Sequence, residues 1–148
     1  MLFRSSREVA LEPPSVFYAF DLPIPASTTK ASPVKVEADL SPGIIHRVEV
    51  EFPAGCAGLV YVAIRRGIHQ VWPGNPDGAF RSDNFVIAWD EHYADLEKPY
   101  LLDLVGWNLD DTYPHTPIVR IGILPAEIAE APQQSAGLLQ RLLRRMGV

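Results

Sequence analysis

Residues 44–64, IIHRVEVEFPAGCAGLVYVAI, contain the pattern that decides the fold. The first half alternates between an apolar side, formed by Ile44, His46, Val48, Val50 and Phe52, and a charged side, formed by Arg47, Glu49 and Glu51. This period of two predicts a strand with one solvated face. The second half, residues 59–64, is apolar on both sides and predicts a buried strand. Residues 53–58, PAGCAG, predict a turn in which small residues permit unusual backbone angles.

The same alternation recurs on both sides of this stretch. Further strands are predicted at residues 16–22, 34–40, 69–72, 85–89, 100–109 and 118–124. The acidic residues 90–98, DEHYADLEK, predict a crossing loop or one short helical turn. The 14 prolines fall at strand boundaries, where a missing N–H is tolerated, and so disfavour helices. About eight strands spaced by roughly 8 to 12 residues predict an all-β fold, a single antiparallel, jelly-roll-like β-sandwich.

Both ends of the sequence differ from this pattern. We expect an extended N-terminal arm at residues 1–15, the sandwich domain at 16–125, a linker at 126–136 and a short amphipathic helix at 137–148. An isolated helix of this length is marginal in water, so its apolar stripe needs a surface to cover. The predicted partner-binding residues are Leu138, Leu139, Leu142, Leu143 and Met146 in the stripe, with Arg141, Arg144 and Arg145 between them. The stripe is expected to bury against a partner or against the chain's own sandwich.

Composition excludes several classes of protein. At 148 residues the chain fits one domain, and its net charge of −5 argues against a role in coating nucleic acid. No window approaches the roughly 18 consecutive apolar residues of a membrane-spanning helix. We read no secretion signal near the N-terminus. The single cysteine, Cys56, excludes an internal disulfide and fits either a reducing compartment such as the cytoplasm or an assembly that needs no disulfide.

No motif for catalysis, a metal or a cofactor is found, so we predict a protein that is not an enzyme. Cys56 has no flanking base, and His46 lies on the apolar side of its predicted strand, as a core histidine would. Neither His69, His92 nor His115 has metal-ligand spacing. An enzyme would instead require three histidines, or two carboxylates and a histidine, that converge in one pocket.

The alternative function is carbohydrate binding. A flat indole can stack on a sugar ring, and Trp72 and Trp107 lie near the ends of predicted strands. Exposed, coplanar indoles would favour this alternative.

The arrangement of an extended arm, a proline-punctuated sandwich and a single thiol resembles the small all-β structural proteins of tailed-phage virions. Segments such as HRVEVEFPAGCAGLVYVAI (46–64), HQVWPGNPDG (69–78) and GWNLDDTYPHTPIVRIGILP (106–125) are similar in style to those proteins. The resemblance implies a non-enzymatic structural subunit of decoration, tail or adaptor type. It also implies self-association and contact with other virion proteins, in a virion assembled in the host cytoplasm.

Overall fold

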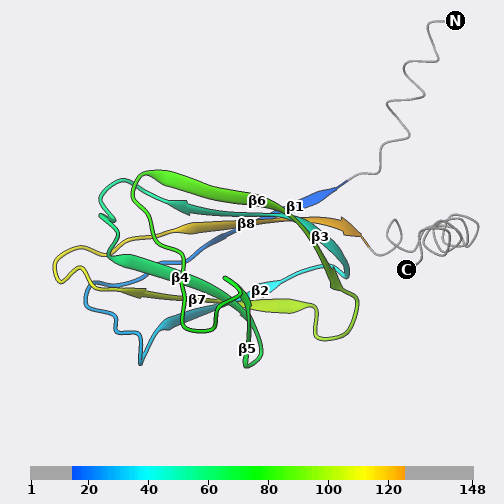
Figure 1. The fold of residues 1–148 in the computed structure, drawn as a ribbon, viewed down its shortest axis with the longest axis horizontal. Coiled ribbons are helices and arrows are strands. Elements are labelled where there is room, and N and C mark those ends of the chain that lie inside the picture. The colour runs from blue at the N-terminus through cyan, green and yellow to red at the C-terminus, as the bar shows by residue number, and fades with distance from the viewer. Residues whose placement is uncertain (1–14, 126–148) are drawn as a thin grey trace, which may run out of the picture.

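A computed structural model describes residues 15–125, and these residues form eight strands without a helix (Figure 1). The strands are β1 (Val16–Asp21), β2 (Val34–Asp39), β3 (Gly43–Phe52), β4 (Val60–Arg66), β5 (His69–Trp72), β6 (Phe85–Asp95), β7 (Leu101–Asn108) and β8 (Ile118–Pro125). They form two four-stranded antiparallel sheets, which confirms the predicted β-sandwich. Apart from Ser15, the predicted arm, linker and C-terminal helix lie outside the described residues and stay predictions.

One rule describes the strand pairing. The first strand pairs with the eighth, the second with the seventh, the third with the sixth and the fourth with the fifth. The chain is therefore one long hairpin, rolled up so that successive pairs join alternate sheets. The β3 sheet has the order β1-β8-β3-β6 and the β4 sheet has the order β2-β7-β4-β5. This rolled hairpin is the topology of a jelly roll.

The topology sorts the loops between two ends of the sandwich. Four connections, β1–β2, β3–β4, β5–β6 and β7–β8, lie at one end, which we call the loop end. The other connections lie at the tail end, where β1 begins and β8 ends (Figure 1). Within residues 15–125, no helix is long and apolar enough to cross a membrane.

The core forms between the sheets from alternate residues of each strand. In β3, Val48, Val50 and Phe52 are 0% exposed, as the alternation predicts. In β4, Val60 and Ile64 are also fully buried, which fits the second half of the deciding stretch. Complete burial of such a side chain stabilises the fold by about 1.5–3 kcal/mol.

The alternation breaks near the start of β3. The register of β3 shifts between Ile45 and Arg47 against both of its neighbours, which is the mark of a β-bulge. Ile45 is 0% exposed and faces the core. The prediction that Ile44 and His46 lie on the apolar side is therefore wrong, because a bulge adds one residue and reverses the faces. His46 lies on the outer face, with its ring centroid 5.7 Å from that of Phe17.

The predicted loop or helical turn at residues 90–98 is also wrong in its first part, because β6 continues to Asp95. Alternation persists through this acidic segment, with Trp89, Glu91 and Tyr93 more buried than their neighbours. Glu91 and Asp95 face the interior because hydrogen-bond donors meet them there. The acidic composition of residues 90–95 thus led to the wrong prediction of a loop where β6 continues.

The turn between β3 and β4 is built as predicted. Gly55 and Gly58 have φ angles of 104° and 74°, and Ala57 has a φ of 51°, all in the left-handed region. Between them, Cys56 is 0% exposed and packs in the core. The turn therefore presents backbone N–H groups outward while its one thiol points inward.

Candidate functional site

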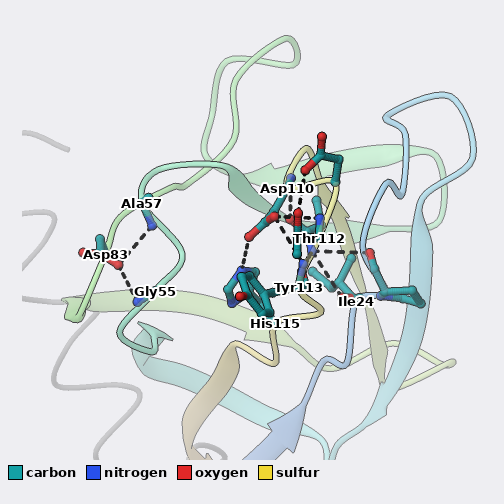
Figure 2. A network of polar contacts seen from close by, with 11 residues as sticks. Ile24, Gly55, Ala57, Asp83, Asp110, Thr112, Tyr113 and His115 are labelled. Carbon is teal, nitrogen blue, oxygen red and sulfur yellow. Dashed lines mark hydrogen bonds and ion pairs between the residues drawn. The ribbon is translucent and has the colours of Figure 1, made fainter.

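A network of polar contacts joins the loops at the loop end (Figure 2). In the β5–β6 loop, Asp83 Oδ1 accepts hydrogen bonds from the backbone N–H of Gly55, at 2.9 Å, and of Ala57, at 3.0 Å. These bonds favour the charged carboxylate and lower the pKa of Asp83. The carboxylate thereby fixes the conformation of the β3–β4 turn.

Asp110 has a similar role in the β7–β8 loop. Its Oδ2 lies 2.9 Å from His115 Nε2, and its Oδ1 accepts from the backbone N–H of Thr112 and Tyr113 at 2.9 and 3.2 Å. The hydrogen bond with His115, followed by the backbone bonds, lowers the pKa of Asp110. Figure 2 shows the Asp110 and His115 side chains pointing toward one another, with Thr112 and Tyr113 beside them.

Asn108 ties this loop to the β1–β2 connection. Its side chain is 0% exposed, and its amide nitrogen donates to the carbonyl oxygens of Tyr113, at 2.9 Å, and Pro25, at 3.3 Å. Backbone hydrogen bonds between Ile24 and His115 join the same two loops. All four loops are therefore held by hydrogen bonds.

Two carboxylates, Asp83 and Asp110, lie near His115 here, whereas an enzyme would require such groups to converge in one pocket. Three carboxylate oxygens, Asp83 Oδ1 and both of Asp110, already bind groups of the loops. The His115 side chain is 9% exposed. Burial, followed by the charges of Asp83 and Asp110, raises the pKa of the Cys56 thiol to about 11. Because the thiolate is the nucleophile, Cys56 is unreactive near neutral pH. We interpret the hydrogen-bond network as structural, since it fixes the conformation of the loops.

The two indoles of the carbohydrate alternative are both covered. Trp72 is 8% exposed and packs between the sheets, with its ring centroid 5.3 Å from that of Tyr93. Trp107 is 5% exposed, stacks on Tyr61 at 5.3 Å, and has Lys30 Nζ 5.6 Å from its ring centroid. An exposed flat face, which sugar stacking needs, is present at neither indole.

Sequence reasoning missed the role of Glu91. Its Oε2 accepts hydrogen bonds from Trp72 Nε1 at 2.7 Å and Trp89 Nε1 at 3.0 Å. Burial raises the pKa of Glu91, but the hydrogen bonds from the His92 backbone and both indoles outweigh it, so the pKa is lowered. One signal could have revealed this residue, because Glu91 continues the alternation of Phe85, Ile87 and Trp89.

The remaining predicted residues are scattered or lie outside the described residues. His69 of β5 and His92 of β6 are exposed, on different sheets. Within residues 15–125, no three His, Cys, Asp or Glu side chains are grouped so that they could hold a metal ion. The predicted partner-binding residues, Leu138 to Met146, lie outside the described residues.

The tail end is the second candidate site, because both chain extensions begin there. Val16, at the start of β1, pairs with Ile123, near the end of β8. Residues 1–14 and 126–148 therefore join the sandwich at one corner (Figure 1). Beside this corner, Phe17 is 52% exposed, on a strand whose other edge has no partner strand among residues 15–125.

No protein-family model and no curated protein matches the sequence. Among solved structures, the chain is similar to a protein of Bacillus endospore appendages, described as disulfide-linked pili, with 13% identity, a TM-score of 0.40 and coverage of 78% of this chain and 92% of that one. For the Yersinia pseudotuberculosis-derived mitogen, the identity is 9%, the TM-score 0.37 and the coverage 78% and 89%. For a chain of infectious bursal disease virus, Gx strain, the values are 10%, 0.30, 74% and 32%.

Proposed function

We propose that this protein is a non-enzymatic structural subunit of an oligomeric assembly, and specifically a tailed-phage virion protein of head decoration, tail or adaptor type. The observation that carries the proposal is the pairing of Val16 with Ile123, which joins both extensions to one corner. Two segments tethered at one point can engage the same neighbour, and the second contact then forms at a high effective concentration.

The sheet edges support the same proposal. Strand β6 is 11 residues long and pairs only with β3, so one of its edges is open among the described residues. Near its start, Phe85 is 60% exposed and Val86 is 39% exposed. A long, open edge that is apolar at its start is a surface on which an extended segment can add a strand. We therefore propose that residues 1–14 of one copy pair with β6 of a neighbour.

Light scattering tests the assembly across a range of micromolar concentrations. The full chain should form a defined oligomer, and deletion of residues 1–14 should shift it toward monomer. A proline in place of Ala88, in the middle of β6, serves as a second variant, and Asp77→Pro in an exposed loop serves as its control. A strictly monomeric full chain would contradict the proposal.

The virion assignment needs a separate experiment. Mass spectrometry of purified phage particles from a host that encodes this sequence should detect the protein in a fixed ratio to the major capsid protein. Its absence from the particles, with an intact oligomer in solution, would exclude the virion and retain the assembly.

A further inference from the structure

An apolar row crosses the outer face of the β3 sheet at the tail end. Leu124 of β8 pairs with Ile44 of β3, and Ile44 pairs with Ala94 of β6. Because the neighbouring Ile45 is 0% exposed and faces the core, these three side chains face outward. Leu96, directly after β6, is 43% exposed and lies beyond the row.

A cavity of about 380 Å³ adjoins the row. Its lining residues are Arg66, Tyr93, Ala94, Leu96 and Glu97. The Arg66 guanidinium is held in place, because it forms an ion pair with Asp95 and donates to the Glu97 carbonyl oxygen at 2.7 Å. We call the row and the cavity together the exit patch; the row is apolar, and the cavity, which shares Ala94 with the row, has the fixed Arg66 guanidinium as one wall.

The C-terminal segment joins the sandwich beside this patch. Pro125 pairs with Gly43, and Gly43 pairs with Asp95, so the end of β8 lies two strand spacings from the end of β6. Neighbouring strands are about 4.8 Å apart, so the separation is about 10 Å. The 11 residues from 126 to 136 can span up to about 36 Å. Residues 137–148 can therefore reach the patch of their own chain.

The segment and the row are both apolar. Residues 137–148 contain four leucines, three arginines and no carboxylate side chain. Of the four carboxylates in residues 90–97, Glu91 and Asp95 face the interior and Asp90 is paired with Arg47, so Glu97 is the one that lines the cavity. A helix of this length is marginal in water unless its apolar face is covered, and the row offers such a cover within reach of residues 137–148.

We propose that residues 137–148 dock on the exit patch of their own chain. The apolar side chains of the segment cover the row from Leu124 to Ala94, and one of them enters the cavity beside Leu96. This inference does not require the assembly proposed above, which depends on the N-terminal arm and on β6.

Hydrogen exchange of the full chain tests the docking. Leu142→Asp places a charge on the apolar stripe, whereas Gln140→Asp places the same charge on the polar side and is the matched control. We expect the amides of residues 93–97 to exchange about tenfold faster in Leu142→Asp than in Gln140→Asp, because only the first loses the cover. Equal exchange in the two variants would overturn the proposal.

The dependence on protein concentration distinguishes docking within one chain from docking between chains. Docking within one chain is unimolecular, so protection of residues 93–97 should stay constant from low to high micromolar concentration. Protection that grows with concentration would show docking between chains and overturn the inference, while the proposed assembly would gain support. A monomer with constant protection would retain the inference and contradict the assembly.

Discussion

His115 Nε2 lies 2.9 Å from Asp110 Oδ2, within the loop that connects β7 and β8. The pKa of Asp110 is lowered chiefly by this contact, so the charged carboxylate is more favourable in the folded chain than in the unfolded one. Its contribution to stability is therefore present above the unfolded pKa, near 3.9, and is lost as pH falls through the lower folded pKa.

The first prediction follows from the lowered pKa of Asp110. Asp110→Asn should destabilise the protein at neutral pH, and the difference from wild type should shrink below about pH 4, where the carboxylate of the unfolded chain is protonated. Urea unfolding at a series of pH values measures the difference in stability between Asp110→Asn and the wild type. Asp77→Asn, in an exposed loop, is the control. A difference that is independent of pH would contradict the assigned role.

The second prediction concerns Glu91, which accepts hydrogen bonds from two indoles. Glu91→Ala leaves both N–H groups without this acceptor and should cost about 1–3 kcal/mol. Glu91→Gln retains one acceptor oxygen and should cost less. Chemical unfolding monitored by tryptophan fluorescence compares the variants. Equal losses would indicate that packing, rather than hydrogen bonding, determines the stability contributed by residue 91.

The third prediction compares two glycines of the β3 sheet. A Cβ on Gly43 would clash with the backbone oxygen of Leu124, whereas one on Gly122 would lie 2.7 Å from Phe17 Cζ, at the tip of a half-exposed side chain. A backbone cannot yield as a side chain can. Gly43→Ala should cost more than about 3 kcal/mol, and Gly122→Ala less than about 1.5 kcal/mol. Thermal unfolding of both variants measures the order, and the reverse order would contradict it.

The fourth prediction concerns the ion pair of Arg66 with Asp95. Asp95 is 0% exposed. Burial raises the pKa of Asp95, although Arg66 opposes this effect. Arg66→Met leaves the carboxylate without its cation and should cost about 3–5 kcal/mol.

Replacement of both partners, Arg66→Met with Asp95→Leu, removes the buried charge and should recover most of that loss. A double-mutant cycle from urea unfolding gives the coupling between them. The cycle also requires Asp95→Leu alone, and a loss in the double variant equal to the sum of the two single losses would show that the pair is not coupled.

Much of the sandwich was predictable because burial repeats every two residues. The period of Val48, Val50 and Phe52 identified β3, and the small residues around Cys56 identified the turn after it. The bulge at His46 was not predictable, since one inserted residue leaves no mark in composition. The end of β6 was missed because its acidic residues are matched by distant donors, such as the indole of Trp72.

The sites were less predictable than the strands. Asp83 and Gly55 are 28 positions apart in sequence, and only the folded loops bring them together. The indoles of Trp72 and Trp107 occupy strand positions that could be exposed or covered, and the covering groups Tyr93 and Tyr61 come from other strands. Single-sequence periodicity contains no information on such neighbours.

The rolled hairpin has a consequence for synthesis on the ribosome. The β4–β5 hairpin is local and can form early, but each later pair joins residues farther apart, and within residues 15–125 the one partner strand of β1 is β8. Loops of increasing length cost more entropy to close, so folding of such chains is slow. During translation, β1 and its aromatic side chains have no partner strand until β8 has been synthesised. A chaperone that shields Phe17 in that interval would raise the yield of native protein.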